Sequence, residues 1–364
     1  MRTRVALLGA SGIVAQRFQQ RLANHPWFEL AAIFGSKNTA GKRVGDLTWK
    51  LEEPRPNLPD LTVQKCDISE LSSQLEKLNI QLVFSALPST VADQLERVLA
   101  KSGCRVFSNS SAHRMDDDVP LVIADLNPHH LLLLRPPFRE AGSGFIACST
   151  NCTVVPAGLP LKPIWDMIGI RHIRIRTQQA LSGGGYPLLE EADSAGEVSA
   201  EIPGEAEKIT EELRRILGRV GPTGIGLASF TTDVECSRVM RRHGHHVEVE
   251  ATLSKAVDLE ELNEWMNPYR GRAQALNLPS APDLPFILSD KPIQPELDRW
   301  SGFQGEGAPN PASDLRAGMS VIVSDLSIEG NIMRFNAFSD NTLRGAAGGC
   351  VLLAELAKVE GLLD

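Results

Sequence analysis

Cys152 has the sequence setting of a reactive thiol. It follows Asn151 and lies between residues 144–147, which predict a strand, and residues 153–168, which predict a helix. A helix N-terminus stabilises a thiolate through its dipole and its free N–H groups, so this setting favours a nucleophile for acyl transfer. A buried structural cysteine is the alternative, and it is the usual fate of this residue type.

His245 is the candidate acid/base residue for that thiol. It lies just before a predicted strand, in the basic run Arg238-Val-Met-Arg-Arg-His-Gly-His-His246. The run could also be a solvated loop or an adventitious metal site, but no carboxylate or cysteine completes a ligand set nearby. Six cysteines are scattered along the chain, and only Cys148 and Cys152 are close together. We therefore predict neither a metal site nor a disulfide framework.

A glycine-rich turn predicts a dinucleotide site. Gly9-Ala-Ser-Gly12-Ile-Val-Ala15 joins a predicted strand at 5–8 to a predicted helix at 13–24. In this position backbone N–H groups and a helix N-terminus can hold a pyrophosphate, and the third position tolerates alanine because it serves helix–strand packing. A plain tight turn is the alternative.

The end of the second predicted strand, 30–34, favours NADP over NAD. NAD sites usually carry an acidic residue there for the ribose hydroxyls, whereas a 2′-phosphate needs donors and positive charge. Residues 35–42 read Gly-Ser-Lys-Asn-Thr-Ala-Gly-Lys, with no acid among them. Ser36 and Lys37 could bind the 2′-phosphate, although a solvated surface lysine is also common.

Two different frameworks must position these residues. The first part alternates apolar runs with amphipathic stretches, which is typical of a parallel, doubly wound sheet. Its expected strands are 5–8, 30–34, 82–86, 105–107, 121–124 and 144–147, and its expected helices are 13–24, 69–77 and 90–101. The later part predicts a mixed α+β sheet faced by helices, with strands 173–181, 226–234, 246–253, 320–328 and 332–338 and helices 153–168, 204–217 and 259–266. Residues 279–315 read as a long loop, and 341–362 as a final helix.

Composition excludes several classes of protein. The chain has 364 residues, of which 42% are hydrophobic and 23% charged, an ordinary globular balance that allows two domains. The net charge of −8 supplies no basic footprint for nucleic acid. Apolar runs fall short of the roughly 20 residues that span a bilayer. Because no cleavage-site pattern follows the N-terminus, we expect a cytoplasmic protein.

A set of motifs in one order along the whole chain resembles the aspartate-semialdehyde dehydrogenase family, in its archaeal and fungal branch. Each motif alone is modest evidence, and the ordered set is specific. Besides the glycine-rich turn and Asn151-Cys152, the motifs are Ser85-Ala-Leu-Pro88, Ser108-Asn-Ser-Ser-Ala-His-Arg-Met115, Val119-Pro-Leu-Val122, Gln179-Ala-Leu-Ser-Gly-Gly-Gly-Tyr-Pro187, Leu278-Pro-Ser-Ala-Pro282 and Asp340-Asn-Thr-Leu-Arg-Gly-Ala-Ala347.

The resemblance implies roles for single residues. Cys152 resembles the nucleophile, His245 the acid/base catalyst, and Gln179 the glutamine that orients the substrate or a water. Arg238 resembles the arginine that grips the substrate α-carboxylate, a bidentate task. Glu205 resembles the carboxylate that receives the substrate amino group. The residues resembling phosphate contacts are Lys208, Arg114 and Asn151.

The resemblance also implies a reaction and an assembly. The reaction is NADPH-dependent reductive dephosphorylation of L-aspartyl 4-phosphate to L-aspartate 4-semialdehyde through a cysteine thioester, and the assembly is a homodimer or a dimer of dimers. We expect a Rossmann domain over 1–150, a catalytic and dimerisation domain over 151–340, and a C-terminal helix within 341–364 that packs back on the first domain. The expected cofactor contacts are Gly9, Ser11, Gly12, Ile13, Ser36, Lys37, Ser85, Ala86, Gly183 and Asn341.

The chain departs from the family pattern in front of His245. The usual Arg-Val-x-Val-x-Asp-Gly-His is changed at Met240–His243, so that His243 replaces an acid and two arginines appear. The added positive charge is expected to lower the pKa of His245 by like-charge repulsion. Strict substrate identity therefore stays open. A paralogue acting on another acyl phosphate or on an acyl-CoA such as malonyl-CoA, and a catalytically silent NADP-binding protein, are the alternatives.

Overall fold

The computed structural model describes residues 2–363, and its first half is built on a parallel sheet. Six strands lie in the order β3-β2-β1-β4-β5-β6, and every neighbouring pair is parallel. They are β1 (Thr3–Leu8), β2 (Phe28–Gly35), β3 (Gln64–Lys65), β4 (Leu82–Ser85), β5 (Arg105–Ser108) and β6 (Phe145–Cys148). This is the doubly wound arrangement that the alternating pattern predicts.

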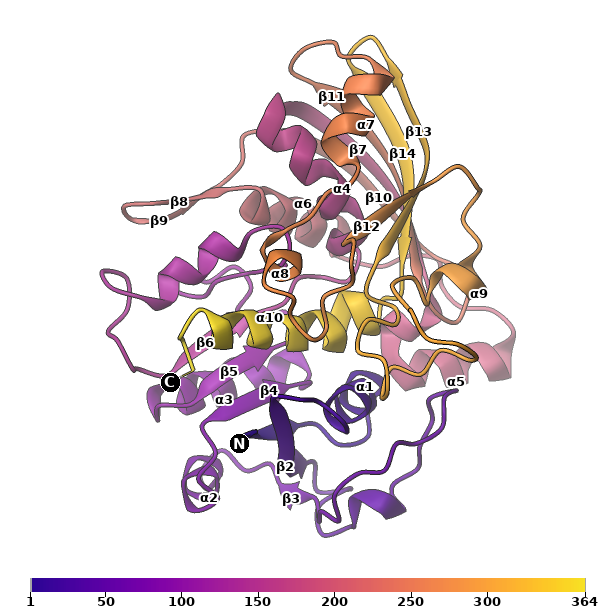
Figure 1. Ribbon diagram of the computed structural model, residues 1–364. Helices are drawn as coiled ribbons and strands as arrows, with labels where there is room; N and C mark the ends of the chain where they lie inside the picture. Colours follow the sequence, from indigo (N-terminus) through magenta and orange to yellow (C-terminus); the bar gives the residue numbers. More distant parts are fainter. Residues whose placement is uncertain (1, 364) are drawn as a thin grey trace.

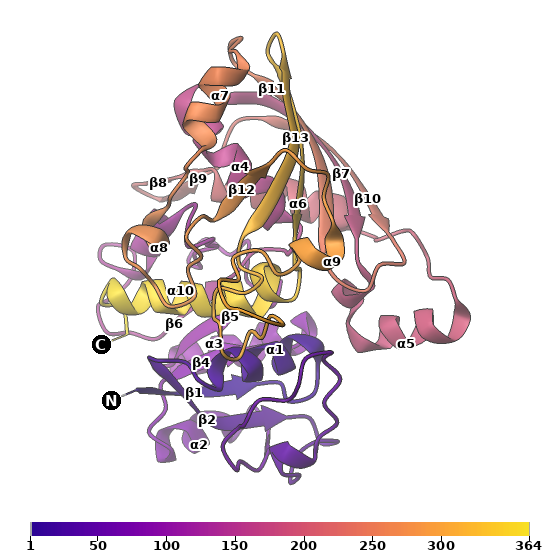
Figure 2. The same cartoon turned by 45° about the vertical axis from the view of Figure 1, so that its right-hand side comes forward.

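Helices cover both faces of this first sheet. Val5 and Leu7 of β1 pack in one core cluster with α1 (Ile13–Leu22) and α10 (Gly348–Val359), while Ala6 and Leu8 pack in another with α2 (Leu71–Lys77) and α3 (Ser89–Lys101). Burial on both faces explains why the strands are almost continuously apolar. Helix α10 contacts β5 and α1 and lies across the sheet, between the two halves of the molecule (Figures 1 and 2).

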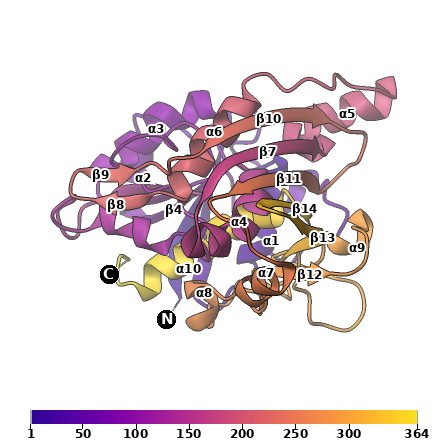
Figure 3. The same cartoon turned by 90° about the horizontal axis from the view of Figure 1, so that it is seen from above.

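The second half is built on a mixed sheet in the order β10-β7-β11-β14-β13-β12. Its central pairs are antiparallel and its two outer pairs parallel, as expected for a mixed sheet. The strands are β7 (Ile170–Gln179), β10 (Thr231–Arg238), β11 (His245–Leu253), β12 (Phe286–Ser289), β13 (Val321–Glu329) and β14 (Ile332–Ser339). Seen from above, β10, β7, β11 and β14 lie side by side (Figure 3).

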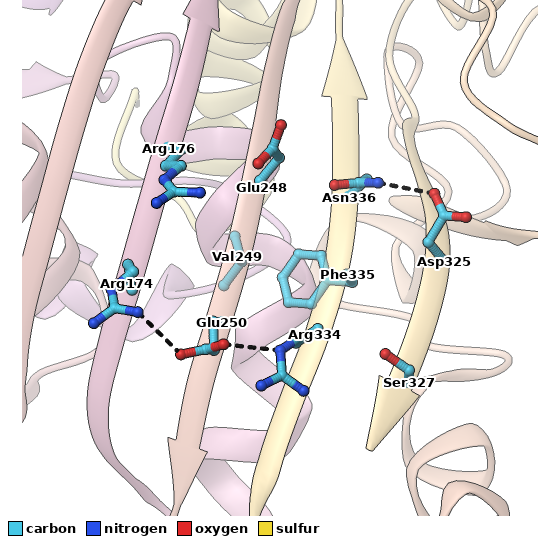
Figure 4. A pocket seen from close by; sticks show the side chains of 10 residues that line it. All are labelled: Arg174, Arg176, Glu248, Val249, Glu250, Asp325, Ser327, Arg334, Phe335 and Asn336. Carbon is cyan, nitrogen blue, oxygen red and sulfur yellow. Dashed lines mark hydrogen bonds and ion pairs between the residues drawn. The ribbon is translucent and has the colours of Figure 1, made fainter. Parts of the chain in front are cut away.

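Among residues 2–363, helices cover one face of this second sheet. Helices α4 (Val154–Met167) and α6 (Glu205–Ile216) contact its strands, and α7 (Leu259–Met266) packs on α4. Residues along β11 alternate accordingly, with Val247 and Val249 buried and Glu248 and Glu250 on the other side. That other face is a shallow charged surface (Figure 4).

Shorter elements connect these layers. The remaining helices and turns are η1 (Val44–Asp46), η2 (Pro128–Leu134), η3 (Leu181–Gly184), α5 (Gly185–Ala195), α8 (Arg272–Ala275), α9 (Pro295–Asp298) and η4 (Leu343–Ala347), and β8 (Arg219–Gly221) and β9 (Gly224–Gly226) form a hairpin. Within residues 2–363, none of the helices has the length and apolar character needed to cross a membrane.

The predicted strand at 121–124 is wrong. Leu121 makes one isolated bridge to Cys148, and the chain then turns away. The side chain of Asn127 accepts a hydrogen bond from the Ile123 N–H and donates one to the Leu121 carbonyl, so groups that a strand ladder needs are already used.

Several boundaries also differ from expectation; for example, the strand expected at 173–181 spans Ile170–Gln179. The strand predicted at 226–234 begins only at Thr231, because Gly226 belongs to the β8–β9 hairpin. The predicted loop 279–315 contains β12 and α9. The final helix begins at Gly348, after a π-type turn at 343–347 in which Ala346 leaves the helical conformation.

Candidate active site

Cys152 lies between β6 and α4, where the two halves of the chain join. Cys152 is mostly buried, and a Cβ added to Gly345 would meet the Cys152 Cβ at 2.6 Å. The π-type turn thus brings a residue without a side chain against the thiol. Such turns occur frequently at functional sites.

The electrostatic setting of Cys152 corrects one expectation. Burial and the negative charge of Glu205 raise the pKa of the thiol to about 12, while Arg114 and Arg238 act in the opposite direction. Helix α4 begins only at Val154, so Cys152 lies outside its first turn. The prediction of a thiolate stabilised by the helix terminus is therefore wrong, because burial outweighs that effect.

Glu205 gathers two of the predicted site residues around one oxygen. Its Oε1 accepts hydrogen bonds from Asn151 Nδ2 at 2.8 Å and from Gln179 Nε2 at 3.3 Å. Glu205 is the first residue of α6 and is buried, so these amides satisfy a carboxylate that has left water. Asn151, Gln179 and Glu205 come from three different parts of the fold.

Arg238 and His245 both form hydrogen bonds with the backbone of Ala180. Arg238 Nη1 donates to the Ala180 carbonyl at 2.9 Å, and the Ala180 N–H donates to His245 Nδ1 at 3.1 Å. A Cβ on Gly183 would lie 2.9 Å from Arg238 Nη1 and 3.3 Å from His245 Nε2. The arginine and the histidine therefore face the same glycine turn.

His245 is held as a neutral imidazole. Burial, followed by the positive charges of Arg238 and Arg241, lowers its pKa to about 3. The predicted direction is confirmed, although burial contributes more than the arginines. Because Nδ1 accepts a hydrogen bond, the ring carries its hydrogen on Nε2, and that buried atom has no partner among the residues that the structure describes.

Asn341 positions the loops around this histidine. Its Oδ1 accepts from the Gly244 N–H at 2.8 Å, and its side chain also exchanges hydrogen bonds with Ser182. Asn341 thereby joins the glycine turn at 181–184 to the residue before His245. Asn341 therefore holds two loops together, and its position is also compatible with the predicted contact with the cofactor.

Two of the residues expected at the phosphate, Arg114 and Lys208, differ in burial. Arg114 is buried, with Nη1 bonded to Glu212 at 3.0 Å and Nη2 to the Asn109 carbonyl at 3.0 Å. Its Nε has no partner within residues 2–363. Lys208 is exposed on α6, one turn beyond Glu205.

Glu212 is a residue of this cluster that the sequence reasoning missed. Its two oxygens accept from Arg114 Nη1 and from the Asn151 backbone N–H, the latter at 2.6 Å. Burial raises the pKa of Glu212, against the pull of Arg114. Glu212 follows Glu205 by two helical turns, so both lie on the same face of α6, and this spacing could have predicted Glu212 as a site residue.

The predicted dinucleotide loop lies at the start of α1. Gly9 has φ +107°, and a Cβ there would meet Ala86 and Ala15, in agreement with the packing role expected of Ala15. Gly12 is the N-cap residue, and a Cβ added to it would meet nothing within 4 Å. Ile13 opens the helix, and Ser85 ends the adjacent strand β4.

A cleft of about 450 Å³ opens beside that loop. Ser11, Gly12, Thr48, Lys50 and Tyr186 are among its lining residues. Further residues expected at the cofactor follow β2: Ser36 and Lys37 are both exposed.

The parallel sheet with its glycine turn, and a thiol, imidazole and guanidinium beside it, define a nucleotide-dependent dehydrogenase. The model of the family described as semialdehyde dehydrogenase, NAD binding domain, matches residues 4–133. The chain belongs to the aspartate-semialdehyde dehydrogenase family. It is 34% identical to the aspartate-semialdehyde dehydrogenase of Archaeoglobus fulgidus, over 100% of both chains.

Two further relatives bear on function. The malonyl CoA reductase (NADP) of Metallosphaera sedula is 33% identical, over 99% of this chain and 98% of that protein. The crystal structure of aspartate semialdehyde dehydrogenase with NADP from Candida albicans has a TM-score of 0.84 and 30% identity, over 100% of both chains.

Proposed function

We propose that the chain catalyses NADPH-dependent reductive dephosphorylation of L-aspartyl 4-phosphate to L-aspartate 4-semialdehyde. The observation that carries this proposal is a buried carboxylate, Glu205, hydrogen-bonded to the residue before Cys152, together with the guanidinium of Arg238, which is hydrogen-bonded to the same residue as His245. A substrate with an ammonium and a carboxylate group matches these two charges. Family membership supports the same reaction.

In this proposal the Cys152 sulfur attacks the acyl carbon and displaces phosphate. The thiol is protonated in the free enzyme, because its pKa is raised to about 12. As the sulfur attacks, its proton passes to a phosphoryl oxygen of the substrate, which thereby acts as the base, and it leaves on the displaced hydrogen phosphate. The predicted phosphate contacts are Arg114 through its free Nε, Asn151, and Lys208.

His245 acts as a neutral hydrogen-bond donor in the second half-reaction. Bound NADPH supplies the hydride that reduces the thioester. The Nε2–H of His245 then stabilises the negative charge on the substrate oxygen, which is a form of oxyanion stabilisation. When the carbon–sulfur bond breaks, the aldehyde leaves and the sulfur takes a proton from solvent, which completes the net uptake of one proton.

The residues of the first half fit NADP. Open space at Gly12, at the N-terminus of the ten-residue helix α1, suits a pyrophosphate. Ser36 and Lys37 follow β2 without an acid, which suits a 2′-phosphate. Gly9, Ser11, Ile13, Ser85, Ala86, Gly183 and Asn341 complete the proposed contact set.

Reduction of malonyl-CoA is the second candidate function, favoured by the similarity to the Metallosphaera enzyme. Malonyl-CoA has no ammonium group, so it leaves Glu205 without a cation. The two candidates are separated by following NADPH formation with aspartate semialdehyde plus phosphate, and with malonate semialdehyde plus CoA. Faster turnover of the second pair overturns the first proposal. The Cys152→Ser variant is the control, with turnover lost and NADP binding kept.

We also propose a homodimer, formed through the helix-free face of the second sheet. This face carries Arg174 and Arg176 on β7 and Glu248 and Glu250 on the neighbouring β11, with Glu250 paired to Arg174 in the same chain (Figure 4). A face with both charges is able to complement a second copy of itself, as a two-fold interface requires. Sedimentation of wild type and Arg176→Glu tests it, since a dimer weakened by the variant is expected. The cytoplasmic location stays a prediction.

A further inference from the structure

The loop between β10 and β11 joins two residues of the proposed reaction, Arg238 at the end of β10 and His245 at the start of β11. Arg238 precedes residues 239–244, and His245 follows them. On one side this loop is bonded to the glycine turn, through Leu181 N–H to the Arg241 carbonyl at 2.9 Å and Ser182 N–H to the Arg242 carbonyl at 3.0 Å. Its other side faces the first half of the chain.

His243 makes the contact on that other side. Its side chain is 7% exposed, and Nε2 lies 3.4 Å from Glu52 Oε1. The other ring nitrogen, Nδ1, is buried without a hydrogen-bond partner among residues 2–363. The proposed chemistry uses neither nitrogen, so this buried, protonatable side chain calls for a different explanation.

Arg299 also pairs with Glu52, and it connects Glu52 to His245 by a second route. Arg299 Nη1 lies 2.9 Å from Glu52 Oε2, and Arg299 Nε lies 3.2 Å from Asp340 Oδ2. Asp340 precedes Asn341, whose side chain receives the Gly244 N–H. His243 and Arg299 together hold the pKa of Glu52 at about 2, so its carboxylate stays charged.

Glu52 belongs to the segment that lines the proposed cofactor cleft. Thr48 and Lys50 of this segment line the cleft. Gln16 of α1 fixes the segment, donating to the Thr48 carbonyl at 2.7 Å and accepting from the Lys50 N–H at 3.0 Å. The carboxylate that holds the catalytic loop is thus two residues from the cleft wall.

We infer that His243 and Glu52 form a positioning pair, which couples the cofactor-lining segment to the loop that carries His245. A nucleotide that orders residues 48–50 also fixes Glu52, and through His243 it fixes the His245 ring. The inference rests on the proposed function for its kinetic part only. The charged groups around this pair are Asp340, which is negative and acts on His243, and Arg242 and Arg299, which are positive and lie against Glu52.

Kinetics of near-isosteric variants test the pair. We expect Glu52→Gln and His243→Asn each to lower kcat for aspartate semialdehyde about tenfold with little change in KM, as for a group that aligns the catalyst without touching substrate. Glu197→Gln is the control, because Glu197 is exposed and lies outside the contacts of Glu52 and His243. Wild-type kcat in both test variants overturns the inference.

A double variant separates positioning from a general loss of stability. His243→Asp opposes two carboxylates, and adding Glu52→Gln removes that repulsion without placing a new cation beside Arg299. We expect the double variant to recover at least half of the kcat that His243→Asp loses. A double variant as slow as the single one contradicts the pairing.

Hydrogen exchange tests the coupling without any substrate. NADP alone is expected to slow amide exchange in residues 239–245 of the wild type, and to slow it less in Glu52→Gln. Equal protection in both proteins overturns the coupling. If the wild type turns over no aspartate semialdehyde, the proposed function fails, and this measurement still decides the fate of the positioning pair.

Discussion

Replacing Glu205 by glutamine separates substrate recognition from the chemistry of the thiol. Glutamine keeps an oxygen that can accept from Asn151 and Gln179, so the local geometry is preserved. The variant loses the negative charge that would meet the substrate ammonium. A hydrogen-bonded buried charge contributes about 1.5–3 kcal/mol. We therefore expect kcat/KM for aspartate semialdehyde to fall about 10- to 150-fold.

The same change should make the free thiol more reactive. Glu205 is one of the two main causes that raise the pKa of Cys152, and burial, the larger, remains. Each pKa unit removed increases the thiolate fraction about tenfold at a fixed pH below the pKa. Alkylation of Cys152 by iodoacetamide, followed by mass spectrometry, should therefore become faster while turnover becomes slower.

Damage to the fold would also expose the thiol and slow turnover, so the variant should keep the thermal unfolding midpoint of the wild type, and a second aldehyde completes the distinction. Glu207→Gln is the matched control, because Glu207 lies on the same helix and is exposed. Succinate semialdehyde, which lacks the amino group, should lose little kcat/KM in Glu205→Gln. If both aldehydes lose equally, or if alkylation slows, the assigned role of Glu205 is refuted.

Three further predictions concern the cofactor, the imidazole and the π-type turn. Lys37→Glu should weaken NADP binding about tenfold and leave NAD binding nearly unchanged, as measured by fluorescence titration. Burial and two arginines lower the pKa of His245 to about 3, so the imidazole is neutral above that value. The plot of kcat/KM against pH should therefore show no loss of activity from His245 between about pH 5 and 8. Arg241→Gln removes a positive charge and should raise the pKa of His245. Gly345→Ala should lower kcat about a hundredfold with NADP binding retained, because the added methyl displaces Cys152; a twofold loss would contradict this.

The first sheet was predictable because its signals are local. Val5 to Leu8, the glycine turn and Ile13 follow one another in the sequence, and each is explained by neighbouring residues. The strand expected at 121–124 failed because the Asn127 side chain, which lies outside that run, occupies its backbone groups. Strand β12 was missed because only its pairing with the distant β13 makes it a strand.

The candidate site was predictable by residue type and less so by environment. Asn151, Gln179 and Glu205 were named from sequence and do meet in the fold. Their effect on the thiol was missed, because burial and the approach of Glu205 depend on how α6 packs. The contact of Glu52 with His243 joins positions 191 residues apart, and neither residue shows a local signal for it.

Ala180 has a consequence for how enzymes of this architecture change substrate. Its carbonyl holds the guanidinium of Arg238 and its N–H holds the ring of His245, so the covalent geometry of one amino acid sets the spacing between them. A longer or shorter molecule cannot be accommodated by moving one of these groups alone. An enzyme that evolves to accept a substrate of different length should therefore change the side of the pocket around residues 151 and 205 and keep the backbone at residue 180.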